Sequence, residues 1–269
     1  MSFIQVQQVG KTYGTNVVLE KLNFTVKEGE FCTMVGMSGC GKTTFLRMLL
    51  GEETPSTGRI LMNDQIMPAE PGPDRGVVFQ RYSVFPHMTV LQNVMFGLEL
   101  KRGGLLGRSF GGVRQRIRQE AEALLVEVGL GQALDKYASE LSGGMQQRLA
   151  LAQALITQPR VLLLDEPFGA LDPGIRADMH ELVLRLWREH RLTVFMVTHD
   201  IEEGFYLGTR LMVFDKIRRD PQAPNAFGAT ITYDLPIGQC AEDKLAEIAS
   251  EVSETRAVIS QAEEQGVLP

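Results

Sequence analysis

The sequence predicts an α/β fold with a mostly parallel sheet, and three patterns support this fold class. An apolar strand at residues 31–35 runs directly into a glycine-rich turn and then into a helix pattern at residues 42–50. Strands at residues 160–164 and 193–197 flank a helix that starts at Asp172, so strand and helix alternate along the chain. Nearer the N-terminus, apolar and polar residues alternate, which predicts antiparallel β elements there.

The composition excludes several classes of protein. The chain has 269 residues, 44% of them hydrophobic, which suits one large domain or two modest ones and excludes a disordered or collagen-like chain. The net charge of −6 offers no domain-wide basic surface for nucleic acid. Cys32, Cys40 and Cys240 have no CxxC spacing, which argues against zinc and disulfides and fits a reducing cytoplasm. No apolar run approaches the roughly 18 residues of a membrane span, so we expect any membrane role to be peripheral.

The domain organisation follows from changes in composition. We expect one catalytic domain over residues 1–236, with a mainly helical subdomain of about residues 89–157 inserted into it. Residues 100–118 hold six bases and no acids, and they fit either a solvated loop or a contact with anionic lipid head groups. Residues 237–269 form an acidic tail with a helical apolar pattern, whose outer face is most simply solvated.

A phosphate-binding motif lies between the first buried strand and its helix. It has the form G-x-x-x-x-G-K-[ST], which predicts a P-loop NTPase fold. Its glycines let consecutive backbone N–H groups point at phosphate oxygens, and the helix N-terminus adds positive potential. The alternative is a glycine turn that binds no ligand, but that interpretation does not explain why the lysine and the hydroxyl residues follow the glycines. The residues that we expect to bind ATP here are Gly36, Met37, Ser38, Gly39, Cys40, Gly41, Lys42, Thr43 and Thr44, with the Thr43 hydroxyl also on Mg²⁺.

Two adjacent carboxylates end the apolar strand at residues 161–164. Asp165 and Glu166 would be costly to keep ionised at the buried end of a sheet without a cation, and Mg²⁺ removes that objection. We therefore assign Asp165 to the metal and Glu166 to polarising the attacking water. The alternative for Asp165 is an ordinary helix cap.

A second phosphate-binding device precedes the helix pattern at residues 146–157. Ser142, Gly143 and Gly144 stand at the N-terminus of that helix, in the sequence LSGGM. A plain helix cap is the alternative in isolation. The position of the motif, 100 residues beyond Lys42, favours a phosphate-binding role over a plain helix cap.

Together these motifs resemble ATP-binding-cassette ATPases over roughly residues 4–214. Gln80 after a strand, the run 169–172 that ends in Asp172, and His199 after a strand complete the resemblance. Residues 166–173 and 198–203 look like the nitrate, sulfonate and taurine importer branch. Residues 215–236 depart from the usual ending and faintly resemble cassettes of urea- or guanidine-type systems.

The resemblance implies roles for four further side chains. Tyr13 would stack on adenine, unless it merely packs against its neighbours. Gln80 would reach the metal and the attacking water, and His199 would contact the terminal phosphate and steady that water. Asp172 would lie where ATP joins two subunits. The other histidines, at positions 87, 180 and 190, receive no catalytic role.

The resemblance also implies partners and a place in the cell. It implies ATP and Mg²⁺ as cofactors, and a head-to-tail homodimer in which LSGGM of one copy completes the site of the other. It implies permease subunits, an upstream solute-binding protein, no nucleic acid, and a location at the cytoplasmic face of the inner or plasma membrane. The apolar loop with Tyr82, Val84, Phe85, Pro86 and Met88 would dock on the permease or else pack in the core. Alternative functions are a soluble cassette acting on nucleic acid or ribosomes, and a P-loop kinase.

Overall fold

The computed structural model describes residues 2–80, 83–102, 112–218, 220, 222–223 and 225–237. The chain divides into two compact units. The first unit contains Met1–Phe45, Thr54–Met67 and the chain from Val197 onward, and the second contains Leu46–Glu53 and Pro68–Met196. The described helices include none that is long and apolar enough to cross a membrane.

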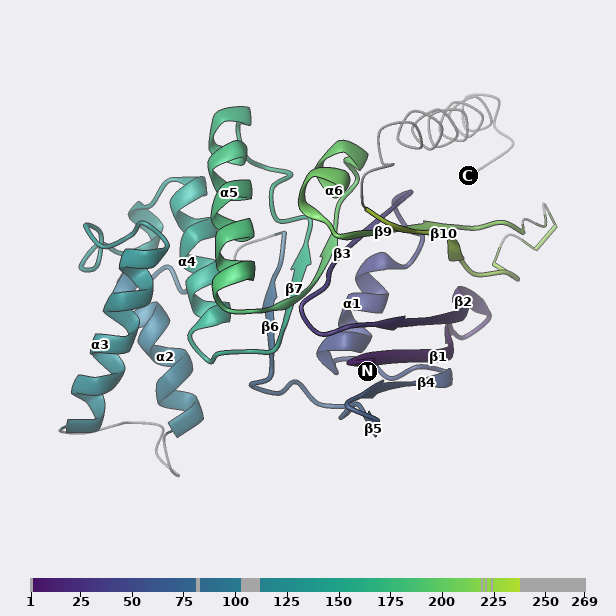
Figure 1. Cartoon of the computed structure of the whole chain (residues 1–269), viewed down its shortest axis with the longest axis horizontal. Coiled ribbons are helices and arrows are strands. Elements are labelled where there is room, and N and C mark those ends of the chain that lie inside the picture. Colours follow the sequence, from purple (N-terminus) through teal and green to yellow (C-terminus); the bar gives the residue numbers. More distant parts are fainter. Residues whose placement is uncertain are drawn as a thin grey trace. The chain divides into compact units, whose positions relative to one another are not determined.

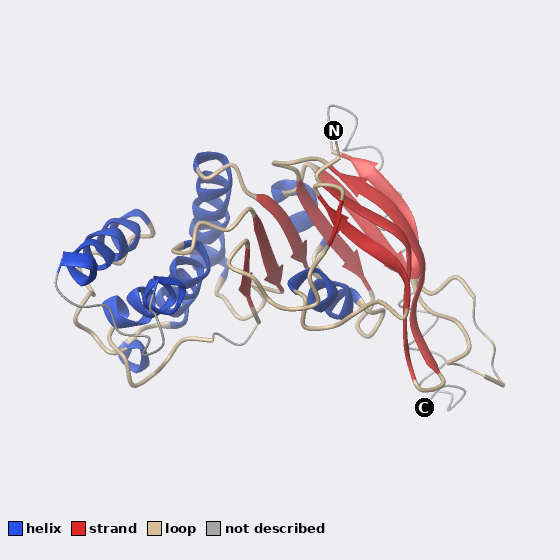
Figure 2. Ribbon diagram, turned by 90° about the horizontal axis from the view of Figure 1, so that it is seen from below, coloured by secondary structure: helices blue, strands red, loops and turns tan. Residues whose placement is uncertain are grey.

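The first unit contains an antiparallel sheet with the strand order β2-β1-β4-β5. The register places Ile4 opposite Val26 on one side of β1 and opposite Met62 on the other. In the second half of β2, the buried apolar side chains of Leu22, Phe24 and Val26 alternate with exposed polar ones, as the sequence pattern predicts. The long strands near the N label curve together as one sheet (Figure 2). The strands are β1 (Ile4–Tyr13), β2 (Asn16–Val26), β4 (Thr57–Met62) and β5 (Gln65–Ile66).

The first unit also contains the strand that carries the phosphate-binding motif. This strand, β3 (Phe31–Gly36), pairs in parallel with β9 (Arg210–Asp215), and β10 (Thr230–Pro236) pairs antiparallel with β9. Helix α1 (Lys42–Leu50) follows the motif, and the short helix α6 (Ile201–Leu207) lies beside β3 and β9 (Figure 1). Ile201 and Phe205 of α6 pack against a buried cluster formed by Val35 of β3 and by Leu211 and Val213 of β9.

Among its described residues, the second unit combines buried strands with four complete helices and with the part of α1 from residue 46 onward. Its strand order is β8-β7-β6, with β7 parallel to β6. Every residue of β8 and the first four residues of β7 are buried, which is typical of strands covered on both faces. The elements are β6 (Arg75–Val78), β7 (Val161–Asp165), β8 (Thr193–Val197), α2 (Val90–Arg102), α3 (Gly112–Glu127), α4 (Gly143–Leu155), α5 (Pro173–Glu189) and a 3₁₀ turn, Ala138–Glu140.

The predicted strands and helices agree with the structure in most places. The strand at residues 193–197 and the helix at residues 42–50 have the predicted bounds. Helices α2 and α6 were not predicted, because α2 carries a buried asparagine within an apolar run and α6 is only seven residues long. The predicted helical tail, residues 237–269, lies outside the described residues except for Ile237, and so do residues 103–111 of the basic segment; the domain boundaries stay predictions.

Candidate functional site

The phosphate-binding loop joins β3 to α1 within the first unit. Gly36 has φ +147° and Gly41 has φ +88°, which are conformations that residues with a side chain rarely adopt. There is also no room for a side chain at either position. A Cβ at Gly36 would collide with the carbonyl oxygen of Phe214, and one at Gly41 would lie 2.7 Å from Leu19 Cδ2. The loop backbone is therefore held tightly by β9 and β2.

Lys42 folds back over this loop. Its side-chain nitrogen donates to the carbonyl oxygens of Gly36, at 2.7 Å, and Met37, at 2.9 Å, and it is 94% buried. The nitrogen also lies 3.5 Å from Cys40 Sγ. Burial raises the pKa of the Cys40 thiol, and Lys42 opposes that effect. The lysine thus places a positive charge inside the concave side of the loop, where a phosphate group would be attracted.

His199 lies on a turn that starts beside β3. The backbone N–H of Thr198 donates to Met34 O at 3.1 Å. The turn therefore starts next to Met34, which is two residues before Gly36 on β3. The Thr198 hydroxyl donates to Glu203 Oε2 at 2.6 Å, and both side chains are buried. The His199 side chain is exposed. Sequence reasoning missed Thr198 and Glu203, although a hydroxyl followed five residues later by a carboxylate was the available signal.

The carboxylates after β7 lie within the second unit. Asp165 ends the strand, and Glu166 follows with φ +46°. A left-handed backbone is costly for a residue with a side chain, and such strain is concentrated at functional sites. Gln80 Nε2 donates to Glu166 Oε2 at 3.2 Å. The structure thus brings together two of the predicted catalytic side chains from segments 86 residues apart.

The LSGGM motif forms the predicted helix N-terminus. Ser142 is the N-cap of α4, and its hydroxyl accepts the backbone N–H of Met145 at 3.4 Å. Asp172 is the N-cap residue of α5, as predicted, although its side chain accepts no capping hydrogen bond from the described residues. Ser142 and Asp172 are both exposed, so both helices begin at the protein surface.

The remaining aromatic and histidine side chains lie as follows. Tyr13 is 45% exposed at the end of β1, with Lys11 Nζ 4.9 Å from its ring centre, so its flat face is not buried in the core. His180 packs against the ring of Phe168. His190 Nε2 lies 2.8 Å from a Glu127 carboxylate oxygen. These contacts agree with the structural roles expected for His180 and His190.

The loop after Gln80 is organised by Asn93, a residue that sequence reasoning missed. The Asn93 side-chain oxygen accepts the N–H of Phe85 at 2.8 Å, and its nitrogen lies 3.1 Å from the Phe85 carbonyl oxygen. The Phe85 ring packs edge-on against Phe96 at 5.2 Å. The signal was a polar residue within the apolar run of α2. Tyr82 lies outside the described residues.

A cavity of about 360 Å³ opens beside this loop within the second unit. Most of its wall is apolar, and α2 supplies one side while the loop and β6 supply another. Its lining includes Phe79, Ser83, Phe85, Phe96, Gly97 and Leu100, and Leu100 is 59% exposed at the edge. An apolar hollow of this size can receive a protruding segment of another protein.

The side chains that could hold Mg²⁺ suit that ion. In the second unit Asp165 offers a carboxylate and Gln80 an amide oxygen, and in the first unit Thr43 offers a hydroxyl; each is an oxygen donor of the kind that Mg²⁺ takes together with phosphates and water. Among the described residues, no group of three or more His, Cys, Asp or Glu could hold a metal ion unaided. Such a donor set fits a metal that arrives with a nucleotide better than a permanently bound one.

Comparison with known proteins gives a consistent result. The family model described as ABC transporter matches residues 19–169. The bicarbonate transport ATP-binding protein CmpD of Synechocystis sp. is 41% identical over 243 residues, which is 87% of this chain and 81% of that protein. The nitrate import ATP-binding protein NrtD of the same organism is 41% identical over 229 residues, covering 85% and 79%. The aliphatic sulfonates import ATP-binding protein SsuB 1 of Paraburkholderia xenovorans is 43% identical over 216 residues, covering 80% of this chain but 58% of that longer protein.

A solved structure supports the same fold. A dimeric ATP-binding cassette in a post-hydrolysis state, bound to ADP and Pi, is similar with a TM-score of 0.70 and 27% identity. The similarity covers 87% of this chain and 99% of that one. The predicted P-loop NTPase fold is therefore confirmed.

Proposed function

Because this chain belongs to the ABC transporter family, we propose that it is the subunit that binds MgATP in a membrane importer and hydrolyses it to drive solute uptake. It is an ATPase of the P-loop type, with an ATP-binding loop between β3 and α1. The observation that carries the proposal is the hydrogen bond between Gln80 and Glu166. Glu166 can accept a proton during hydrolysis, and Gln80 precedes the loop that lines the apolar cavity, so the bond links a catalytic group to a candidate docking surface.

ATP binding begins at the phosphate loop. Its backbone N–H groups and the N-terminus of α1 attract the phosphates, and Lys42 adds a full charge there. A phosphate oxygen would replace the carbonyl oxygens of Gly36 and Met37 as partners of Lys42 Nζ. Thr43, Gln80 and Asp165 are the side chains that would hold Mg²⁺, and the ion would neutralise phosphate charge when bound. Tyr13, exposed at the end of β1, stacks on the adenine.

Hydrolysis depends on three side chains. Glu166 accepts a proton from the attacking water, and Gln80 holds the carboxylate in position through its amide. His199 contacts the terminal phosphate and steadies the water from the turn that Thr198 and Glu203 fix beside β3.

The site is completed by a second copy of the chain. In a head-to-tail homodimer, Ser142, Gly143 and Gly144 at the N-terminus of α4 face the terminal phosphate that the other copy binds. Asp172 lies at the same junction, with a side chain that is exposed and does not cap its own helix. Two helix N-termini from opposite sides stabilise the phosphate charge better than one.

A mixing experiment tests the composite site. At a MgATP concentration well below the raised Kd of Lys42→Met, that variant and Ser142→Arg are each expected to show almost no hydrolysis. Mixed together, they form dimers in which one of two sites has an intact loop and an intact LSGGM, so random pairing restores about a quarter of wild-type activity. The control is Lys42→Met mixed with Glu166→Gln, because these residues belong to the same half-site and every site in that mixture stays defective. No recovery in the first mixture would overturn the head-to-tail dimer.

The apolar cavity beside α2 is the docking place for the permease. A short permease segment that fills the cavity contacts Phe85 and Phe96, and Asn93 links that contact to the loop behind Gln80. This places the chain at the cytoplasmic face of the membrane, held there by its partner. Phe96→Asp is expected to release the chain from co-purified permease in detergent while its basal ATP hydrolysis persists. Retained binding would contradict this docking place.

The solute is proposed from the relatives. Their names give bicarbonate, nitrate and aliphatic sulfonates, so a small oxyanion or sulfonate is the favoured cargo, with a urea- or guanidine-type solute as the alternative. An upstream binding protein selects it. Uptake of labelled nitrate, taurine, bicarbonate and urea by vesicles that carry the complete transporter distinguishes these cases.

A further inference from the structure

The connection between β9 and β10 does more than reverse the chain. Ordinary hairpins turn in about two to five residues, whereas residues 216–229 separate these two strands. This is the segment whose sequence departs from the usual ending. Its described residues do not project freely, because several of them bond to β2 within the first unit.

The bonds to β2 form a short strand-like pairing. Ala229 donates its N–H to Val18 O at 2.9 Å and accepts the N–H of Glu20 at 3.0 Å, on either side of Leu19. Farther along, the N–H of Val17 donates to Asn225 O at 2.9 Å. These three backbone bonds fix the position of β2 at Leu19.

Side chains strengthen the same pairing. Arg218 forms an ion pair with Glu20 at 2.6 Å, and its guanidinium lies 4.4 Å from the ring centre of Phe227. Gly228 lies directly against the Leu19 backbone, where a Cβ would be 2.9 Å from the Leu19 nitrogen. Leu19 is thus held from one side by the connection.

The other side of Leu19 meets the phosphate loop. The Leu19 side chain is 1% exposed, and its Cδ2 would lie 2.7 Å from a Cβ at Gly41. Val18 Cγ1 approaches the same place at 2.9 Å. Gly41 in turn accepts the N–H of Phe45 in the first turn of α1. A displacement of Leu19 would therefore reach both the loop and its helix.

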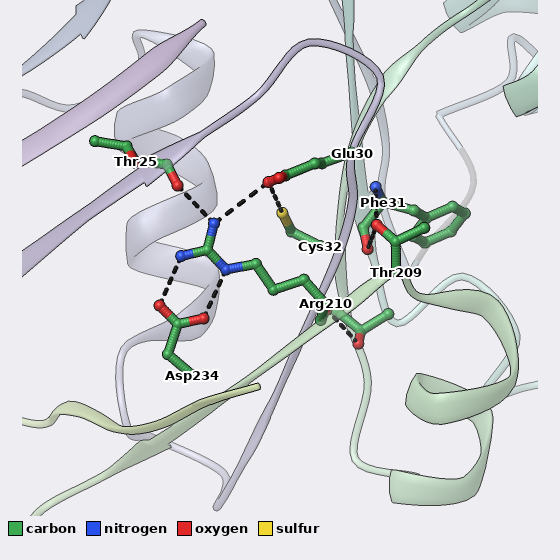
Figure 3. Close-up of polar contacts among 8 residues, drawn as sticks. Thr25, Glu30, Phe31, Cys32, Thr209, Arg210 and Asp234 are labelled. Atoms are coloured by element: carbon green, nitrogen blue, oxygen red, sulfur yellow. Dashed lines mark hydrogen bonds and ion pairs between the residues drawn. The ribbon is translucent and has the colours of Figure 1, made fainter. Parts of the chain in front are cut away.

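The strand β9 supports the opposite end of the loop, and its own position is fixed by Arg210. Figure 3 shows the Arg210 guanidinium between Asp234 on β10, Thr25 on β2 and Glu30 before β3. It donates to both Asp234 carboxylate oxygens at 2.6 Å. At the far end of β9, Phe214 O closes the space at Gly36. Strand β9 consequently contacts the phosphate loop directly at Gly36, and the β9–β10 connection contacts Leu19, which in turn contacts Gly41.

We propose that the β9–β10 connection is a positioning element for nucleotide binding, in which Gly228 and Arg218 hold Leu19 against Gly41 and so set the geometry of the phosphate loop. The inference rests on the ATP binding proposed above. Anion binding by backbone N–H groups depends on their direction, and a misplacement of about 1 Å can cost up to about a hundredfold in function. The expected consequence is a loss of MgATP affinity with little change in maximal turnover once nucleotide is saturating.

The test compares two Gly→Ala substitutions in the first unit. In Gly228→Ala the new Cβ meets the Leu19 backbone at 2.9 Å, and in Gly58→Ala, on β4, the new Cβ collides with the carbonyl oxygen of Gln8 on β1. Both substitutions crowd the backbone, and both are expected to lower the Tm of the nucleotide-free protein. Only Gly228→Ala is expected to raise the Kd for MgATP, by about tenfold. Its MgATP-induced rise in Tm is correspondingly smaller than that of the wild type.

A milder variant guards against misfolding of Gly228→Ala. Arg218→Gln removes a half-exposed ion pair, keeps the fold, and is expected to raise the Kd by about two- to threefold. Wild-type affinity in both Gly228→Ala and Arg218→Gln overturns this proposal and leaves the ATPase assignment intact. An equal loss of affinity in Gly58→Ala also overturns it, because general destabilisation then explains the result. Absence of MgATP binding by the wild type would overturn the ATPase assignment and this proposal together.

Discussion

Strands β3 and β7 are both buried, and polar functional groups follow the carboxyl end of each. The two segments that carry these groups are built differently. After β3, glycines take the unusual backbone angles, and Lys42 bonds to carbonyl oxygens of its own loop. After β7, Glu166 takes a left-handed backbone although it carries a side chain, and it meets Gln80. In the proposed mechanism, binding therefore depends on backbone groups, and catalysis on the side chain of one residue with a strained backbone.

The difference has a physical cause. A phosphate needs several donors from different directions, which a wrapped backbone provides at little conformational cost when glycine occupies the turns. A general base needs one atom in one place, and a strained backbone of about 1–3 kcal/mol can be the means of aiming it. The loop after β3 and the segment after β7 should therefore respond differently to mutation.

The largest expected effect is at the β7 end. Glu166→Gln keeps the shape and the contact to Gln80 but removes the proton acceptor, so turnover should fall by about 10² or more while MgATP binding persists. ATP-stabilised dimers should accumulate, measured by size-exclusion chromatography alongside phosphate release. Glu181→Gln, an exposed change on α5, is the matched control. Unchanged hydrolysis in Glu166→Gln would remove the contrast between the two ends.

At the β3 end the effect should appear in affinity. Lys42→Met removes a charge-assisted hydrogen bond to phosphate, so the Kd for MgATP should rise by about 10- to 100-fold. Equilibrium binding measurements check this, with exposed Lys27→Met as the control. If Lys42→Met binds MgATP with normal affinity but hydrolyses it slowly, Lys42 acts in catalysis and not in binding.

The support of β3 can be tested through Arg210. Asp234 raises the pKa of the Arg210 guanidinium above its usual value, and the group also contacts Thr25 O and Glu30. Arg210→Gln should lower the free energy of unfolding by about 1–3 kcal/mol, since it leaves partly buried carboxylates unpaired. Urea unfolding measures this change. Arg185→Gln on α5, an exposed ion pair, should cost less than about 1 kcal/mol. Equal losses would mean that the cluster in Figure 3 adds no special support.

The smallest expected effect concerns Cys40 in the phosphate loop. Burial raises the pKa of its thiol, so the reactive thiolate is scarce in the native protein even above the ordinary thiol pKa of about 8.5. Alkylation of Cys40 at pH 8.5, followed by peptide mass spectrometry, should be at least about tenfold slower in the native than in the urea-unfolded chain. Saturating MgATP should slow it further. Fast native labelling would show that the loop opens more readily than its contacts indicate.

Sequence reasoning predicted the motif-bearing elements well. Strand 193–197, helix 42–50 and the helix start at Ser142 are confirmed, because each combines a clear apolar pattern with a clear boundary residue. It did not find Asn93 or Glu203, which are buried polar residues whose partners lie on neighbouring turns. Bicarbonate as the named cargo of a relative was also outside the expectation.

The sequence alone determined the chemistry, because the spacing of glycine, lysine, carboxylate and histidine residues around short apolar strands has few other uses. The tertiary structure decided which residues distant in the sequence contact one another, which the spacing of motifs does not specify. Glu166 takes a left-handed backbone beside Gln80, and Leu19 stands between Gly41 and Gly228. These arrangements join residues that are far apart along the chain. They arise from close packing, in which each atom's place depends on all its neighbours.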